Sequence, residues 1–91
     1  MVIEREQAEA LALQALGYLA EDEERFRRFL LLTGTALADI RERAADPAFL
    51  SGVMDHLISD EPLLLSFAEQ ATLDPAAVVA ARRSLPAATE L

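Results

Sequence analysis

His56 is the only histidine in the chain, and an imidazole near neutral pH can transfer a proton or bind a metal ion. It lies in the stretch VMDHLISDEP, directly after Asp55 and four residues before Asp60. Consecutive side chains on a helix point about 100° apart, so Asp60 can face His56 and Asp55 does not. Proton transfer needs a substrate group or nucleophile within reach, and a metal site needs at least three protein ligands. The stretch suggests neither, so we interpret His56 as a residue at the border of a helix's apolar face.

The other side chains that could perform chemistry have simpler explanations. Asp46 and Asp74 directly precede prolines, and Asp60 stands two residues before one, so all three occupy positions typical of helix starts. No serine lies on a strand-to-helix elbow with a second histidine available, and the three glycines are scattered rather than grouped in a phosphate-binding loop. Without cysteine there are no thiolate metal sites or disulfides. We expect no enzymatic activity, no cofactor and no bound metal.

The elements that would position these side chains are predicted to be helices throughout. The Asp-Pro and Asp-Glu-Pro signals recur every 14 residues and mark the starts of three helices. Gly34 ends the second helix in a left-handed conformation, and Thr35 is expected to cap a short third helix that carries Leu37 and Ile40. Three Glu-to-Arg pairs, Glu21–Arg25, Glu23–Arg27 and Glu24–Arg28, are spaced to support the second helix. The five expected longer helices cover residues 4–20, 23–33, 47–59, 61–72 and 75–85.

The apolar pattern predicts an all-α fold, a compact bundle of five to six short helices with orthogonal or irregular packing. Residues 1–91 are expected to form a single domain, with 86–91 as a loose C-terminal tail after Pro86. In the fifth helix the apolar residues cover an arc of roughly 200°, which predicts that this helix is central and packed on two sides. In the fourth helix Ser51, Asp55 and Ser59 are expected to face water, opposite the apolar face.

The charge distribution restricts the classes of partner. The formal net charge is -8, and every basic residue is an arginine. Residues 44–81 contain six acids and no arginine or lysine, so this surface repels duplex DNA and anionic membranes. The N-terminus has no basic segment followed by an apolar one, and no aliphatic run is long enough to span a bilayer. We expect a cytoplasmic protein that binds neither nucleic acid nor membrane.

Residues 29–44, with the sequence FLLLTGTALADIRERA, have the helix, glycine turn, helix layout of a helix-turn-helix. This gives the alternative function of a nucleic-acid-binding protein. Leu30 is large for a position where two such helices cross closely. Asp39 and Glu42 offset Arg41 and Arg43 in the second helix, and the net charge of -8 opposes phosphate binding. The layout is therefore retained as a structural expectation, while nucleic-acid binding is disfavoured.

Two surfaces are candidates for contact with another protein. Leu31 lies between Arg27 and Arg28 on the outer side of the second helix, and leucine with arginine suits an interface. The alternative is the acidic surface of residues 44–81, represented by Asp55 and Glu69. Our leading hypothesis is a non-enzymatic protein-binding or adaptor module. The sequence leaves open which of the two surfaces is used, and also the oligomeric state.

Three segments carry a resemblance to a known family: LQALGYLAEDEERFRRFLLLTG, DPAFLSGVMDHLISDEPLLLSFAE and LDPAAVVAARRSLP. They resemble a small bacterial family classified as a domain of unknown function, numbered 3572, over nearly the whole chain. These motifs are core and capping patterns, so the resemblance implies a compact all-helical domain. The family has no assigned activity, and the resemblance therefore gives no residue a functional role.

Overall fold

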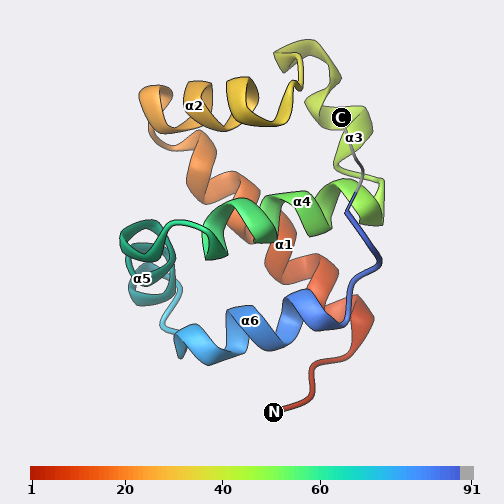
Figure 1. The fold of residues 1–91 in the computed structure, drawn as a ribbon, viewed down its shortest axis with the longest axis vertical. Coiled ribbons are helices and arrows are strands. Elements are labelled where there is room, and N and C mark those ends of the chain that lie inside the picture. The colour runs from red at the N-terminus through yellow and green to blue at the C-terminus, as the bar shows by residue number, and fades with distance from the viewer. Residues whose placement is uncertain (89–91) are drawn as a thin grey trace.

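The computed structural model describes residues 1–88, and within that range it contains helices and no strand (Figure 1). The predicted all-α bundle is confirmed. Residues Pro86 to Ala88 follow the last helix without helical structure, while 89–91 of the expected tail lie outside the described residues. The elements are α1 (Arg5–Ala20), α2 (Glu23–Thr33), the 3-10 helix η1 (Leu37–Asp39), α3 (Ile40–Arg43), α4 (Pro47–Ile58), α5 (Glu61–Gln70) and α6 (Pro75–Arg83).

Aspartate side chains cap the starts of four helices, including the three starts predicted at Asp46, Asp60 and Asp74. The carboxylate of Asp46 accepts a hydrogen bond from the backbone N–H of Ala48 at 3.0 Å, and that of Asp74 accepts one from Ala76 at 2.9 Å. Asp60 and Asp22 do the same for α5 and α2. Each cap satisfies a backbone donor that has no partner inside the helix. The helix starts are therefore determined locally.

The expected cap at Thr35 is wrong. Gly34 ends α2 with φ of 68°, as predicted, but Thr35 then turns inward and is buried. Its backbone N–H donates to Leu30 O at 3.0 Å, and its hydroxyl accepts a hydrogen bond from Thr33 Oγ1 at 3.0 Å. Thr35 is thus bound to the end of α2, and η1 begins after Ala36 with no side-chain cap.

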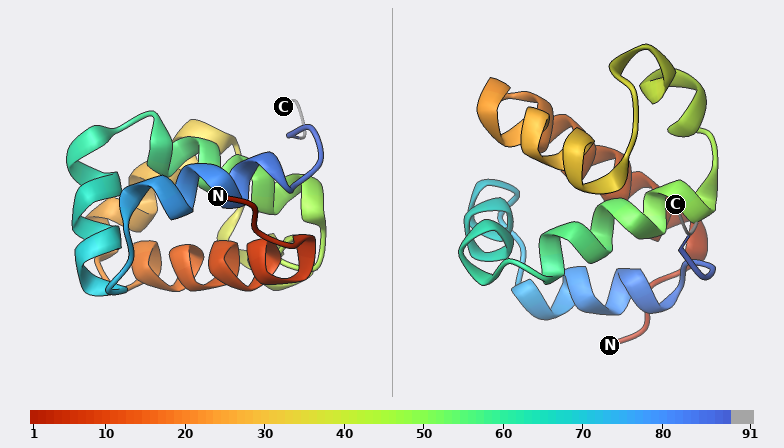
Figure 2. Two further views of the ribbon diagram at one scale, coloured as in Figure 1. Left: turned by 90° about the horizontal axis from the view of Figure 1, so that it is seen from below. Right: turned by 45° about the horizontal axis from the view of Figure 1, so that its top comes forward.

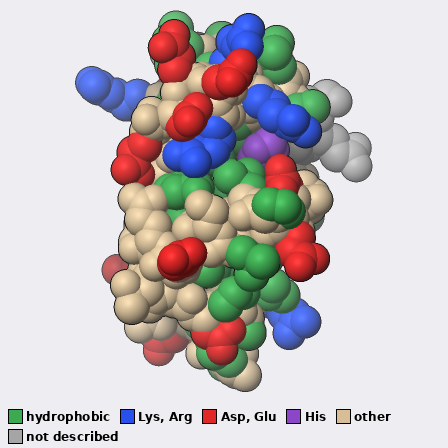
Figure 3. All heavy atoms as spheres, turned by 90° about the vertical axis from the view of Figure 1, so that its left-hand side faces the viewer, with side chains coloured by type: hydrophobic (Ala, Val, Ile, Leu, Met, Phe, Trp, Pro, Cys, Tyr) green, Lys and Arg blue, Asp and Glu red, His purple; other side chains and the backbone are tan. Residues whose placement is uncertain are grey.

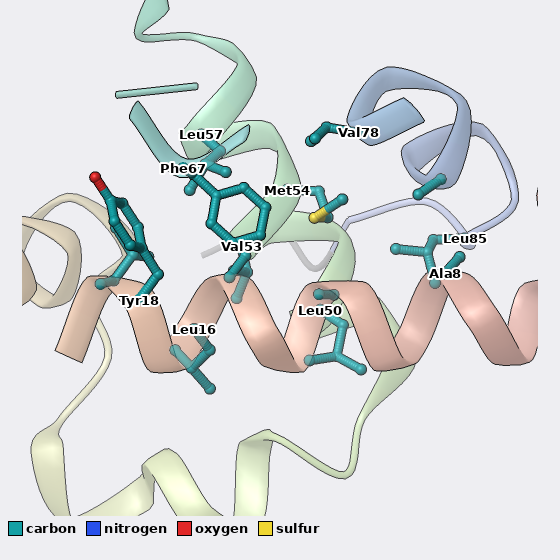
Figure 4. Packing of buried hydrophobic residues seen from close by; sticks show 14 of the residues in the cluster. Ala8, Leu16, Tyr18, Leu50, Val53, Met54, Leu57, Phe67, Val78 and Leu85 are labelled. Carbon is teal, nitrogen blue, oxygen red and sulfur yellow. The ribbon is translucent and has the colours of Figure 1, made fainter. Parts of the chain in front are cut away.

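Helices α1 and α4 form the centre of the bundle. Helix α4 packs against α1, α5 and α6, and α1 packs against α2, α4 and α6 (Figures 1 and 2). Figure 4 shows Leu50, Val53, Met54 and Leu57 of α4 gathered near the middle of α1, where the two helices cross. All four side chains are buried.

The prediction that the fifth helix is central is wrong. Helix α5 lies at one side of the bundle and packs against α4 and α6 (Figure 1). Leu64 and Phe67 are buried, but Leu65 is 46% exposed. The wide apolar arc reflects three consecutive leucines, of which only the middle one is fully buried.

Ser51 is also placed differently from the expectation. It is completely buried on α4, where its hydroxyl lies 3.1 Å from Pro47 O and 2.6 Å from Pro86 O. A hydroxyl in the core requires such acceptors. Pro86 is also contacted by Arg82, whose Nη1 lies 3.3 Å from Pro86 O. The segment after α6 is therefore held against α4 as far as Pro86.

Among residues 1–88 no single helix has the length and apolar content needed to cross a membrane. Helices α5 and α6 meet that criterion only when taken together, and they are bent by 104° relative to each other.

Candidate functional site

His56 lies near the end of α4 and is half-buried. Its ring packs edge-on against Phe29 of α2, with 5.2 Å between ring centroids and 77° between the planes. Burial lowers the pKa of His56 from its ordinary value of 6.5 because the charged form loses solvation; Asp60 acts in the opposite direction and Arg28 in the same direction. This confirms His56 as a border residue and adds an aromatic partner that the sequence did not indicate.

The surroundings of His56 do not assemble a catalytic pair. A shallow hollow of about 340 Å³ is lined by the imidazole together with Arg28, Leu32, Ser59 and the start of α5. Asp60 is engaged as the cap of α5. Asp55 points away from His56, and its carboxylate binds Arg82 at 2.6 Å. Figure 3 shows the histidine at the surface between arginine and acidic side chains.

Within residues 1–88 no three histidine or acidic side chains are arranged to hold a metal ion. The expectations of no metal, no cofactor and no enzymatic activity stay predictions.

The outer face of α2 brings together the three residues proposed as a contact. Leu31 is 74% exposed and lines an open hollow of about 500 Å³ with Glu24, Arg25, Arg27 and Arg28. Neither η1 and α3 nor the described part of the C-terminal segment covers it. Helix α2, which carries this patch, lies at one end of the molecule (Figures 1 and 2).

Two more exposed leucines follow in the same segment, and the sequence reasoning missed them. Leu32 is 65% exposed and lines the hollow beside His56, while Leu37 in η1 is 66% exposed. Leu37 was expected to lie on a helix with Ile40, but it falls in the 3-10 turn before that helix. A signal for Leu32 existed, since it lies one turn after Arg28 on the exposed side of α2.

Arg25 also has a role that the sequence did not indicate. Its guanidinium lies 4.0 Å from the centre of the Tyr18 ring, and Nη1 and Nη2 donate to the Tyr18 hydroxyl and carbonyl oxygens at 3.1 and 3.0 Å. The same hydroxyl lies 2.6 Å from Ser66 Oγ. This network joins α1, α2 and α5.

The network of Arg25, Tyr18 and Ser66 replaces the expected ion pair between Glu21 and Arg25. Glu21 accepts hydrogen bonds from Gln70 instead of pairing with Arg25. Arg27 meets Glu24 at 3.6 Å rather than Glu23. Among the described residues Arg28 forms no ion pair, so the predicted set of three pairs is wrong.

The acidic surface of residues 44–81 is interrupted by an arginine. Arg82 reaches from α6 to Asp55 of α4, with Nε and Nη2 at 2.6 and 3.3 Å from the two carboxylate oxygens. Glu69 lies exposed on α5. Of the two acidic candidates, Asp55 is therefore already engaged within the chain.

The helix-turn-helix layout is only partly present. After the turn at Gly34 the chain forms the three-residue η1 and the four-residue α3 instead of one continuous helix. A recognition helix that enters the major groove presents several side chains along its length. The element at 37–43 is shorter than such a helix.

Comparison with known proteins gives one match. The model of a family described as "Protein of unknown function (DUF3572)" matches residues 5–88. Neither the curated proteins nor the solved structures include a match to this chain.

Proposed function

The chain belongs to the DUF3572 family of proteins of unknown function, and on that premise we propose that it is a non-enzymatic protein-binding or adaptor module. The proposal describes a bacterial, cytoplasmic protein that docks another protein on the outer face of α2. We define the α2 surface as Arg27, Arg28, Leu31, Leu32 and Leu37.

One observation carries the proposal: three large leucines between positions 31 and 37 are each more than 60% exposed. Single exposed leucines are common on protein surfaces and need no partner. Three in one short segment, beside two arginines, indicate a contact site, because grouped exposed apolar side chains mark interaction sites and arginine is enriched at protein interfaces. The acidic surface of residues 44–81 is the weaker candidate for docking. Leu65 is its one large exposed apolar side chain, and Asp55 is already paired with Arg82.

Nucleic acid is the weaker candidate partner for the same surface. The element after Gly34 is short, and the net charge of -8 opposes phosphate binding. We expect duplex DNA at physiological salt to bind with a Kd above about 10⁻⁴ M, the weak end of non-specific binding. Sequence-specific DNA binding that is lost in Arg41→Ala/Arg43→Ala would replace the proposal with the helix-turn-helix function.

The test compares three tagged forms of the protein by affinity purification from native cells with quantitative mass spectrometry. These are the wild type, Leu31→Asp, and Leu65→Asp as a control that places the same charge on an exposed leucine of α5. A protein that is recovered with the wild type and the control, is lost with Leu31→Asp, and binds the purified wild type supports the proposal. Equal recovery by Leu31→Asp and Leu65→Asp contradicts it, provided circular dichroism shows both variants folded.

A further inference from the structure

We infer that the partner of the α2 surface is an acidic amphipathic helix, whose apolar side chains cover Leu31 and Leu32 while its carboxylates pair with Arg27 and Arg28. The inference rests on the proposed function and names the chemistry of its partner. Three observations carry it: the local charge, the state of the arginines and the arrangement of the leucines around them.

The local charge is opposite in sign to that of the whole chain. The hollow around Leu31 is lined by three arginines and one glutamate, which gives a formal charge of +2 in a chain of net -8. A partner rich in lysine or arginine is attracted to the remainder of the molecule but repelled here. A partner that docks on α2 is therefore expected to present carboxylates to this patch.

The arginines differ in how firmly they are held. Arg25 is engaged by Tyr18 on its ring face and at two oxygens. Arg27 meets Glu24 at 3.6 Å, with both side chains largely exposed, and such a surface pair is exchanged at little cost. Arg28 forms no ion pair within residues 1–88. Arg27 and Arg28 are thus the two guanidinium groups available to a partner.

The two leucines flank Arg28 on the helix surface. Leu31 and Leu32 lie three and four residues after it, so both are its neighbours on α2. Leu31 lines the hollow on one side of Arg28, and Leu32 lines the hollow on the other with His56, Asp60 and Glu61. The acids of the partner are therefore placed on the Leu31 side, away from Asp60 and Glu61. Leu31 in turn lies between Arg27 and Arg28, which stand four and three residues before it. A helix that carries an apolar stripe bordered by acids matches this order of cationic, apolar and cationic groups, because packed helices interlock their side-chain rows.

A second copy of the chain is a poorer match for the same surface. In another copy the hollow around Leu31 presents three arginines against the single carboxylate of Glu24, so self-pairing at this hollow leaves like charges facing each other; Asp60 and Glu61 line only the second hollow, beside Leu32. Nucleic acid supplies negative charge but no apolar side chains to cover the leucines.

The experiment uses the full-length protein and three fluorescently labelled synthetic peptides of about 20 residues, long enough to be helical. The first has a leucine stripe bordered by glutamates. The second replaces every glutamate with lysine, and the third replaces every leucine with alanine. Binding is measured by fluorescence anisotropy for the wild type, Arg28→Glu and Leu31→Asp. Arg83→Glu and Leu65→Asp are matched controls, since both residues are exposed on other helices.

We expect the leucine–glutamate peptide to bind the wild type and both controls alike. Arg28→Glu should weaken it about tenfold or more, which corresponds to 1.4 kcal/mol, and Leu31→Asp should do the same. The lysine and alanine peptides should bind the wild type at least about tenfold more weakly. Equal affinity for the glutamate and lysine peptides, no effect of Arg28→Glu, or no binding of any peptide overturns the inference.

Two results separate this inference from the proposed function. If a cellular protein depends on Leu31 but the peptides do not show the acidic preference, the docking surface stands and the partner chemistry is wrong. Sedimentation of the protein alone over a range of concentrations tests the second copy. A dimer that is lost in Leu31→Asp and retained in Leu65→Asp overturns the acidic helix as the occupant.

Discussion

At the scale of residues, the side chains best suited to chemistry are engaged in packing. The imidazole of His56 lies against Phe29. The hydroxyl of Tyr18 accepts a hydrogen bond from Arg25 and contacts Ser66. Burial lowers the pKa of His56, with Arg28 of α2 acting in the same direction and Asp60 opposing it; Glu61 of α5 lines the same hollow. His56 is thus held as the neutral imidazole at neutral pH.

This state predicts how stability depends on pH. Because the pKa of folded His56 is lowered, its contribution to stability is fully present above the unfolded value of 6.5 and is lost as pH falls through the folded pKa. His56→Phe keeps an aromatic ring against Phe29 and removes the titration. Urea unfolding at pH 8 and pH 5 should therefore show a larger loss of stability for the wild type than for His56→Phe. An equal loss in both proteins would show that His56 is not held neutral by burial.

Residue roles were predictable where the partner is local. The caps at Asp46, Asp60 and Asp74 bind backbone groups two or three residues away, so the sequence indicated them. Ser51, Arg82 and Tyr18 have partners 35, 27 and 48 residues distant, and a single sequence carries no sign of such pairings. The α2 contact candidates were indicated in part: Leu31 was recognised from its position between arginines, and Leu32 and Leu37 were not.

At the scale of elements, the helix boundaries could be predicted from caps and prolines, but the position of each helix in the bundle could not. Apolar arc alone suggested that α5 is central, although α4 occupies that place. Helix α4 owes its position to contacts with α1, α5 and α6, which depend on how the chain turns between helices. That information is tertiary, so the composition of one helix could not supply it.

Whether α4 or α5 is the central helix decides how much stability a leucine-to-alanine substitution costs in each. Leu57 of α4 is completely buried, and Leu65 of α5 is 46% exposed. Leu57→Ala should lower the free energy of unfolding by about 2–5 kcal/mol through the cavity it leaves. Leu65→Ala should lower it by less than about 1 kcal/mol, as at other surface positions. Chemical denaturation measures the free energy of unfolding of both variants. Similar losses in the two would show that α5 is as central as α4.

At the end of α5, a substitution is expected to raise stability rather than lower it. Thr72 adopts a positive φ of 56°, a conformation that suits glycine and strains a β-branched residue. The backbone N–H of Leu73 donates to Ala68 O at 2.8 Å, which closes the helix end around it. Thr72→Gly should raise the free energy of unfolding by about 0.5–1 kcal/mol as the strain is relieved. Thermal unfolding measures the effect, and a loss of stability would show that the threonine side chain contributes more than the strain costs.

At the scale of the whole molecule, most of the arginines and the most exposed leucines share one segment, which is distinct from the segment that lacks basic residues. Residues 44–81 contain no arginine or lysine, while five of the eight arginines lie between positions 25 and 43. The same segment holds Leu31, Leu32 and Leu37, which are the large leucines most exposed among the described residues. This asymmetry supports the proposal that the molecule docks its partner through the end formed by α2, η1 and α3.

The most direct test of this account is an NMR titration of the isotope-labelled protein with the partner recovered by affinity purification. Backbone amide shifts report the contact face residue by residue. The account predicts that the perturbed amides cluster in residues 23–37, and that α5 and the Asp55–Arg82 region are unchanged. Perturbations clustered on α4 and α5 around Asp55 and Glu69, with residues 23–37 unaffected, would contradict the α2 surface and assign binding to the acidic face.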